Sequence, residues 1–227
     1  MADNASAAGA SVAGRPVVVF DFDGTLADTK GAIVRTATEV LLAHGLGEGE
    51  LGDVGRIVGP PFPQAFSLVY GLSQDEALSI THDYRKIYER MGLEAWPLFP
   101  GMRELLERLR GSGRRLAVAS SKRESLLRRG LCDNGIEGVF ELVVGNKDDG
   151  NHTKAKALAE VMAVMGVGAE DCVMVGDRLY DVEGALACGM PCVGVELGNT
   201  AAPGELAEAG ACAVVGSVEE LGRVLVG

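Results

Sequence analysis

Short runs of apolar residues recur along the chain, and segments with helical spacing separate them. Runs that are rich in Val and bounded by polar or turn residues predict buried strands. Because such strands alternate with helices, the pattern favours an α/β fold built on a mostly parallel sheet. The predicted strands are residues 17–20, 116–119, 142–144, 173–175, 193–195 and 213–215.

Helix ends can be placed at two points of the pattern. Residues 101–110 carry apolar side chains at helical spacing, and Gly111 follows as a stop signal. Ser217 and Glu220 have the spacing of a capping box, which predicts that the last helix begins there. Both helices are therefore expected to pack an apolar stripe on the sheet.

The interval between residues 29 and 97 contains helical patterns and no convincing strand. It is too long for a simple crossover, so we predict an all-helical cap domain over 29–97. The core would then consist of 15–28 and 98–227, with hinges near Asp28–Lys30 and Pro97–Gly101. Residues 1–14, rich in Ala, Gly and Ser, are expected to form a disordered leader.

Composition restricts the partners of this chain. Its 227 residues carry a net charge of −11, which argues against a nucleic acid polymer as ligand. The five cysteines form no Cys-x-x-Cys pair and are expected to be free thiols in a reducing compartment. No apolar run approaches the roughly 18 residues of a membrane span. We expect a cytoplasmic monomer or weak homodimer without a membrane partner.

Polar residues follow three predicted strands where each one ends. Asp21 and Asp23 follow the first strand, Ser120 the second and Asp177 the fourth, while Lys154 opens a helical pattern. Parallel strands bring these ends to the edge of the sheet where ligands bind. Two carboxylates one residue apart are costly unless a cation, a shared proton or fixed donors compensate them. The combination predicts metal-assisted phosphoryl transfer.

Each of these residues has an expected role. Asp21 would attack phosphorus, and Asp23 would protonate the leaving oxygen and then activate water. Asp21 and Asp177 would share a hard cation, most simply Mg²⁺. Lys154 would offset charge on the nucleophile and the phosphate, and Asp181 would orient metal-bound waters or hold Lys154.

The expected phosphate contacts come from two short segments. The hydroxyl of Ser120, with Ser121 beside it, would bind phosphate oxygens. Gly24 and Thr25 form a turn whose backbone can approach a ligand. The histidines at 44, 82 and 152 show no ligand or triad spacing and are expected to be structural or surface residues.

Taken together, these motifs resemble the haloacid dehalogenase superfamily of phosphatases. The resemblance implies a Rossmann-like core with a helical cap inserted after the first motif. It also implies Mg²⁺ held by Asp21, the backbone carbonyl of Asp23, and Asp177. The segments similar to the four family motifs are Asp21–Leu26, Val118–Lys122, Lys154, and Gly176–Asp177 with Asp181.

Within that superfamily the chain looks most like the phosphoglycolate phosphatase and nucleotidase-like branch. Val58–Phe62 and Thr153–Ala155 are similar to nucleotidase-like members, although Tyr180 stands where that branch often has histidine. The resemblance implies hydrolysis of a small phosphorylated metabolite through an aspartyl-phosphate. Asp23 favours phosphoryl chemistry over carbon–halogen cleavage, because the dehalogenases lack the second aspartate.

Three alternatives stay open at this point. A sugar phosphomutase of the same superfamily would usually show a histidine shortly after the first motif, and residues 28–32 contain none. A phospho-acceptor resembling receiver domains would group similar residues without a helical cap. A binding protein without activity would not need to keep Asp21, Asp23, Lys154 and Asp177.

Overall fold

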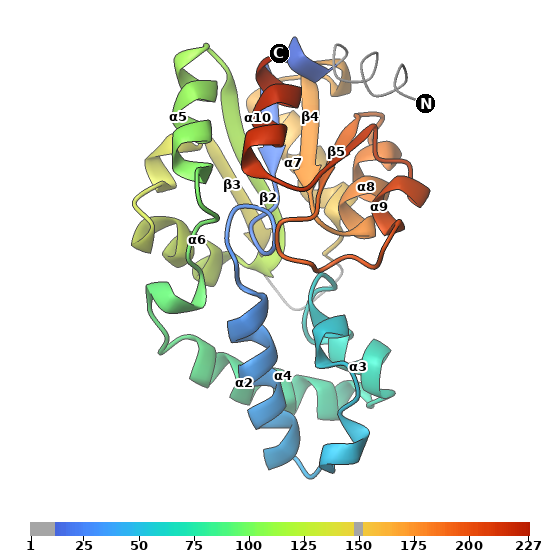
Figure 1. Ribbon diagram of the computed structural model, residues 1–227. Helices are drawn as coiled ribbons and strands as arrows, with labels where there is room; N and C mark the ends of the chain where they lie inside the picture. Colours follow the sequence, from blue (N-terminus) through green and yellow to red (C-terminus); the bar gives the residue numbers. More distant parts are fainter. Residues whose placement is uncertain (1–11, 148–151) are drawn as a thin grey trace.

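The computed structural model describes residues 12–147 and 152–227 and centres on a six-stranded parallel sheet (Figure 1). The strand order is β3-β2-β1-β4-β5-β6, which confirms the predicted parallel α/β core. All six predicted strands are present, and four of them extend beyond the predicted range. The strands are β1 (Val17–Phe20), β2 (Arg115–Arg123), β3 (Leu142–Asn146), β4 (Cys172–Gly176), β5 (Cys192–Val195) and β6 (Ala213–Val215).

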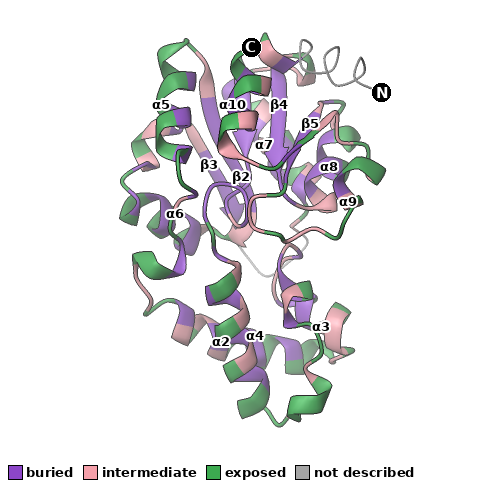
Figure 2. Ribbon diagram, in the orientation of Figure 1, coloured by how far each residue is buried: buried purple, intermediate pink, exposed green. Residues whose placement is uncertain are grey.

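Helices cover both faces of the sheet, and the alternation along β1 shows why. Val18 and Phe20 pack into a cluster with residues of α5 (Met102–Gly111), α6 (Glu124–Asp133) and α10 (Val218–Val226). Val17 and Val19 pack on the opposite face. That face is covered by α7 (Lys154–Met165), α8 (Leu179–Ala187) and the short α9 (Glu205–Glu208). Buried strands between exposed helix surfaces are visible in Figure 2.

Strand order reverses at β1, and this reversal locates the ligand crevice. The chain crosses from β1 to β2 and β3 on one side, then returns to β4, β5 and β6 on the other. In open parallel sheets a crevice forms at such a switch point, outside the carboxyl ends of the strands. Asp21, directly after β1, therefore lies at the expected position.

Helical structure fills the interval between β1 and β2. It consists of α2 (Lys30–Ala43), α3 (Gln64–Tyr70) and α4 (Gln74–Tyr88), with short 3-10 turns that include η2 (Val54–Ile57). Figure 1 shows these helices grouped beyond one end of the sheet. The pattern of apolar residues between 29 and 97 thus predicted the helical type of this segment correctly.

The chain passes between the sheet and the helical segment twice, at residues 26–28 and 97–99, and these two connections are hydrogen-bonded to each other. Ala27 and Leu98 form an isolated antiparallel bridge. The Asp28 N–H donates to the Pro97 carbonyl at 2.8 Å, and the Phe99 N–H donates to the Leu26 carbonyl at 3.1 Å. The segments at which hinges were predicted are thus joined by backbone hydrogen bonds.

Several local expectations differ in detail from the structure. Residues 1–11 of the expected leader lie outside the described residues, whereas Val12 is fully buried against the core. The Ser217 hydroxyl caps α10 as predicted, but Glu220 accepts from the Gly216 N–H, one residue earlier than a capping box requires. In the described part of the chain, no helix is long and apolar enough to span a bilayer.

Candidate active site

The carboxyl ends of three neighbouring strands bring the candidate residues together. In the register of the sheet, Phe20 lies opposite Val118 of β2 and Val175 of β4. The Asp21 N–H continues this pairing by donating to the Val175 carbonyl at 2.9 Å. Asp21, Ser120 and Asp177 therefore line one pocket, as their positions after the strands predicted.

The turn after β1 depends on Gly24. Its φ of +73° lies in the left-handed region, which favours glycine. Its N–H donates to the Ala27 carbonyl at 2.9 Å and closes the turn. A Cβ atom on this residue would lie 2.0 Å from Oδ2 of Asp177. Glycine therefore allows the turn to pass directly against the carboxylate that follows β4.

Three carboxylates meet beneath this turn. Asp21, Asp177 and Asp181 are buried, and each offers an oxygen within 4.8 Å of the others. Burial, followed by the charges of Asp181 and Asp21, raises the pKa of Asp177 well above its usual range. Such a cluster needs positive charge to stay ionised. Three of the residues named from the sequence therefore lie together at one acidic site.

Lys154 supplies one positive charge to this cluster. Its Nζ lies 3.1 Å from Asp21 Oδ1 and 2.7 Å from Asp181 Oδ1, and it donates a hydrogen bond to the Ala119 carbonyl at 2.8 Å. Burial lowers the pKa of Lys154, but Asp181 and Asp21 outweigh that effect and raise it above its usual value. The ammonium therefore stays protonated at the start of α7.

Both carboxylate oxygens of Asp181 contact other groups of the protein. Its Oδ2 accepts the N–H groups of Asp177 and Arg178, each at 3.1 Å, at the start of α8. Burial raises the pKa of Asp181 to about 6, while Lys154 acts in the opposite direction. These contacts leave Asp181 better suited to orient Asp177 and Lys154 than to bind a metal directly.

Asp21 and Asp177 have the donor atoms that a hard cation needs. Oδ1 of Asp21 is buried and accepts no hydrogen bond from residues 12–147 or 152–227, although Lys154 Nζ lies 3.1 Å away. Asp177 accepts hydrogen bonds from the hydroxyls of Thr25, at 3.1 Å, and Thr200. Carboxylate oxygens are ligands that Mg²⁺ prefers. The single charge of Lys154 does not balance three carboxylates. The site therefore suits a divalent cation by its charge as well as by its oxygen ligands.

Asp23 points to a different partner from that of Asp21. Its Oδ1 accepts a hydrogen bond from Lys122 Nζ at 2.9 Å, and Oδ2 lies 3.3 Å from the same atom. Lys122 belongs to the segment similar to the second family motif, yet the sequence prediction gave it no role. β2 continues to Arg123, but its pairing with β3 shifts register between Ala119 and Arg123, and the Lys122 N–H donates to the Ser120 hydroxyl at 3.3 Å. Regular strand alternation therefore does not hold there, and the only signal in the sequence was that Lys122 directly follows Ser120 and Ser121.

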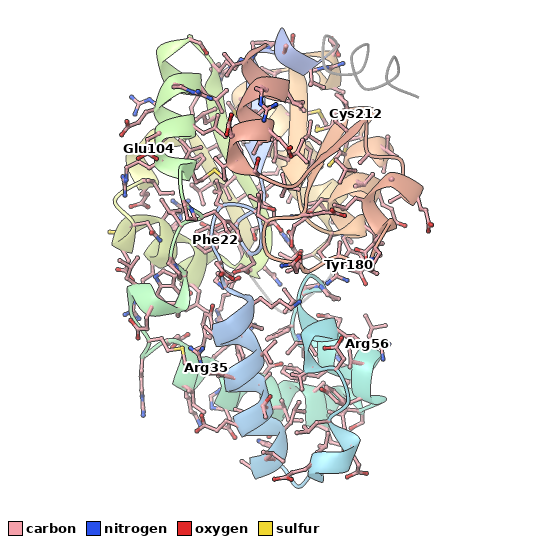
Figure 3. All side chains as sticks on the ribbon, in the orientation of Figure 1. Phe22, Arg35, Arg56, Glu104, Tyr180 and Cys212 are labelled. Carbon is pink, nitrogen blue, oxygen red and sulfur yellow. The ribbon has the colours of Figure 1, made fainter. Side chains whose placement is uncertain are left out.

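The pocket in front of these residues lies between the sheet and the helical segment. Its walls combine the carboxylates with Ser121, Asn146 and apolar or aromatic side chains of the helical segment. Figure 3 places Phe22 and Tyr180 at the level where the two parts meet, with Arg35 and Arg56 in the helical segment. The side chains from the helical segment are Ile33, Ile57, Val58, Pro60, Phe62, Tyr84, Arg85 and Tyr88.

Gly24 and Thr25 have contacts within the protein that the sequence did not predict. The Thr25 N–H lies 3.4 Å from the Phe22 carbonyl and, like that of Gly24, donates within the turn. Neither residue lines the pocket, and the Thr25 hydroxyl holds Asp177. Their expected contact with phosphate stays a prediction, while their contact with Asp177 is present.

The histidines and cysteines lie outside this charge cluster. His44 pairs with Asp83 on the helical segment at 3.0 Å, and His152 lies 3.1 Å from the Ser120 carbonyl at the rim. All five cysteines are free, as the sequence predicted. Burial raises the pKa of Cys172 to about 11, which keeps this thiol protonated at neutral pH.

Comparison with known proteins agrees with this geometry. The model of the haloacid dehalogenase-like hydrolases matches residues 18–195. A 5'-nucleotidase of Pseudomonas aeruginosa is 34% identical over 184 residues, which cover 81% of this chain and 83% of that protein. The tyrosine-protein kinase PtkA of Mycobacterium tuberculosis is 40% identical over 186 residues, which cover 80% of this chain and 62% of that protein.

A solved structure extends the similarity to the fold. A predicted phosphatase from Clostridium acetobutylicum superimposes with a TM-score of 0.86 at 31% identity, covering 92% of this chain and 97% of its own. The matched region contains every candidate residue from Asp21 to Asp181. The chain therefore belongs to the haloacid dehalogenase-like hydrolase family.

Proposed function

We propose that the protein is a Mg²⁺-dependent phosphomonoesterase that acts on a small phosphorylated metabolite through a phosphoenzyme on Asp21. The observation that carries the proposal is the buried cluster of Asp21, Asp177, Asp181 and Lys154 at the carboxyl ends of β1 and β4. The 5'-nucleotidase and the phosphoglycolate phosphatase of Caulobacter vibrioides, 30% identical over 200 residues, support this reaction class.

Asp21 has the position and surroundings of a nucleophile. One carboxylate oxygen would attack phosphorus and form an acyl-phosphate while the ester P–O bond breaks. Lys154, 3.1 Å from Oδ1, places a positive charge beside this side chain and would offset charge on the phosphoryl group. Ser120 and Ser121 line the same pocket and would donate hydroxyl hydrogen bonds to the phosphoryl oxygens.

Asp23 would transfer the protons. It would give one to the oxygen of the departing alcohol, then take one from the water that attacks the phosphoenzyme. That second attack breaks the acyl-phosphate bond, releases inorganic phosphate and returns Asp21 as a carboxylate. The Asp23 side chain lines the pocket beside Asp21, which supports this division of roles.

Mg²⁺ would be held by Asp21, Asp177 and the backbone carbonyl of Asp23. When bound, the ion supplies positive charge that neutralises the carboxylates and the phosphoryl oxygens. The chain's own contribution is to hold Asp177 through Thr25, Thr200 and the packed Gly24 turn. Asp181 would fix Lys154 and the start of α8 around it.

The helical segment would act as a cap over the pocket. It supplies most of the apolar and aromatic wall, including Phe62 and Tyr84, and it connects to the core through two short crossings. These side chains would surround the alcohol part of the substrate. Phosphoglycolate, nucleoside monophosphates and sugar phosphates are the substrates to compare first.

The proposal is tested by phosphate release from p-nitrophenyl phosphate and from that substrate panel. Activity should require Mg²⁺, disappear with EDTA and return when Mg²⁺ is restored. Asp21→Asn should lower kcat by at least about 10⁴-fold, because the nucleophile is lost. Asn keeps the size of the side chain, so thermal melting checks that the variant is folded. Activity that survives in Asp21→Asn would refute the nucleophile assignment.

A second candidate is transfer of the phosphoryl group to a hydroxyl other than water, favoured by the 40% identity with the tyrosine kinase PtkA. The same Asp21 intermediate could be attacked by a tyrosine or sugar hydroxyl. Incubation with ATP and a tyrosine-containing peptide distinguishes the two outcomes. Phosphopeptide formation favours transfer, and release of inorganic phosphate alone favours hydrolysis.

A further inference from the structure

The ammonium of Lys122 is enclosed at the junction of the sheet and the helical segment. Its side chain is 6% exposed, and that of Asp23 is 18% exposed. Both carboxylate oxygens of Asp23 lie within 3.3 Å of Nζ. Among residues 12–147 and 152–227, no second ion-pair partner of either side chain is found. The two groups therefore compensate each other's charge in a nearly dry environment.

Aromatic side chains complete the enclosure of this ammonium. Nζ lies 4.7 Å from the centre of the Tyr88 ring and 5.8 Å from that of Phe22. The Tyr88 hydroxyl is 3.4 Å away and is a further hydrogen-bond partner. A cation against aromatic faces is held at a defined position, most strongly where water is excluded. Lys122 is thus fixed by Phe22 from the loop after β1 and by Tyr88 from α4.

Tyr88 is itself immobilised within the helical segment. It is fully buried, stacks on Tyr84 with ring centres 5.2 Å apart, and packs 5.5 Å from Trp96. Tyr84 in turn meets Phe62 edge to face at 4.9 Å. A continuous aromatic stack therefore runs from the pocket wall in the helical segment to Lys122, and through Lys122 to Asp23.

We propose that Lys122 is a positioning residue for Asp23: Lys122 holds the Asp23 carboxyl group in the orientation from which it, when protonated, gives its proton to the leaving oxygen, and Tyr88 holds Lys122 in place. This inference rests on the proposed function, because it assumes that Asp23 transfers a proton. Displacement of a reacting group by about 1 Å can cost about 10²-fold in rate, so a fixed carboxylate matters. The helical segment would then contribute to the geometry of proton transfer as well as to the pocket wall.

A double-mutant cycle on Asp23 and Lys122 tests the inference with two esters of nearly equal shape. Phenyl phosphate has a poor leaving group and needs a proton from Asp23, whereas p-nitrophenyl phosphate has a good one. The readout is kcat/KM, because it reports the step in which the leaving group departs and leaves out the later hydrolysis of the phosphoenzyme, which is the same for both esters. Asp23→Asn should lower kcat/KM for phenyl phosphate by about 10²–10⁴-fold. Lys122→Met should lower it by about 10–100-fold. Both variants should change kcat/KM for p-nitrophenyl phosphate much less.

The double variant Asp23→Asn/Lys122→Met decides whether Lys122 acts through Asp23. Its kcat/KM for phenyl phosphate should equal that of Asp23→Asn alone, because a positioning residue has no effect once its target is gone. The double variant also replaces the ion pair by two neutral side chains, so it avoids an uncompensated buried charge. Lys86→Met is the matched control, because Lys86 pairs with Asp83 on the exposed surface of α4.

Each result either supports or overturns the inference. A selective loss for phenyl phosphate in Lys122→Met, absent in the Asp23→Asn background and in Lys86→Met, supports it. Equal losses for both esters, or losses that add in the double variant, show that Lys122 only stabilises the fold or acts independently. An inactive wild type, or Asp23→Asn without leaving-group dependence, overturns the proposed function first, and this inference with it.

Discussion

At the scale of single residues, the two aspartates after β1 are separated by their partners. Asp21 faces Lys154 at 3.1 Å, and Asp23 faces Lys122 at 2.9 Å. Lys154 is buried, the Lys122 side chain is 6% exposed, and the neighbouring carboxylates raise the pKa of both lysines. Two chemically identical side chains can therefore hold different roles, because each has its own electrostatic environment.

Gly24 offers a test of how tightly this loop is built. Gly24→Ala should lower the free energy of unfolding by about 1–2 kcal/mol, since alanine is strained at positive φ. It should also displace Asp177, because the new methyl group would lie 2.0 Å from Oδ2. We expect at least about a tenfold loss of kcat/KM and weaker Mg²⁺ dependence. Urea denaturation and Mg²⁺ titration of the activity measure the two effects.

Gly45 provides the matched control for this substitution. Its φ of +94° imposes similar backbone strain, but no atom lies within 4 Å of the added methyl group. Gly45→Ala should therefore lose stability while keeping kcat/KM and Mg²⁺ dependence. If both variants lose activity equally, backbone strain rather than the Asp177 contact explains the effect.

The sequence predicted the position of a residue correctly where that residue directly follows a strand of the sheet. Asp21, Ser120 and Asp177 converge because they follow adjacent parallel strands, and Lys154 because it opens the next helix on that side. The sequence did not predict which lysine would form an ion pair with Asp23. The pairing of Lys122 with Asp23 depends on β2 continuing past Ser120 and on Tyr88, 34 residues away, closing the site. Tertiary packing, which a local pattern does not contain, decides such contacts.

At the scale of elements, the Arg178 side chain connects the pocket loop of the helical segment to the core. The Arg178 guanidinium forms an ion pair with Glu205 at 3.0 Å and donates to the carbonyl of Val58, just after η2. Burial opposes ionisation of Glu205, but hydrogen bonds from Ala202, Leu179 and Arg178 lower its pKa overall. Gly59 lies so close that a Cβ there would be 2.9 Å from the guanidinium. The contact fixes the loop that forms one wall of the pocket.

Removal of this guanidinium should loosen the loop. In Arg178→Ala, backbone amides of residues 54–59 should exchange about tenfold faster, which corresponds to loss of a charged hydrogen bond of about 1.5 kcal/mol. Hydrogen–deuterium exchange by mass spectrometry measures this change. Arg223→Ala is the control, because the pair that Arg223 forms with Glu219 is exposed and 3.8 Å long. Unchanged exchange at 54–59 in Arg178→Ala would show that other contacts hold the loop.

At the scale of the whole molecule, the sheet and the helical segment share one apolar core. A single buried cluster contains Val18 and Phe20 of β1 together with Ile57, Phe66 and Tyr84 of the helical segment. The sequence predicted two parts, and the structure joins them by continuous packing as well as by the paired crossings. The parts are therefore expected to unfold together.

Trp96, the one tryptophan in the sequence, reports on this junction. It is fully buried against Tyr88, its Nε1–H donates to Asp133 of α6 at 3.1 Å, and its carbonyl accepts from Asn134 at 2.8 Å. In a urea titration, tryptophan fluorescence and far-ultraviolet circular dichroism should give the same midpoint, since one cooperative transition moves both signals.

Asn134 allows a sharper form of this experiment, because its side chain donates to the carbonyls of Trp96 and Gly130. Asn134→Ala should lower both midpoints together, by about 1–3 kcal/mol of unfolding free energy, as buried carbonyls lose their partner. A fluorescence midpoint that falls below the circular dichroism midpoint would mean that the helical segment detaches first. The shared core would then be too weak to couple the two parts, and closure over the pocket would be an equilibrium of its own.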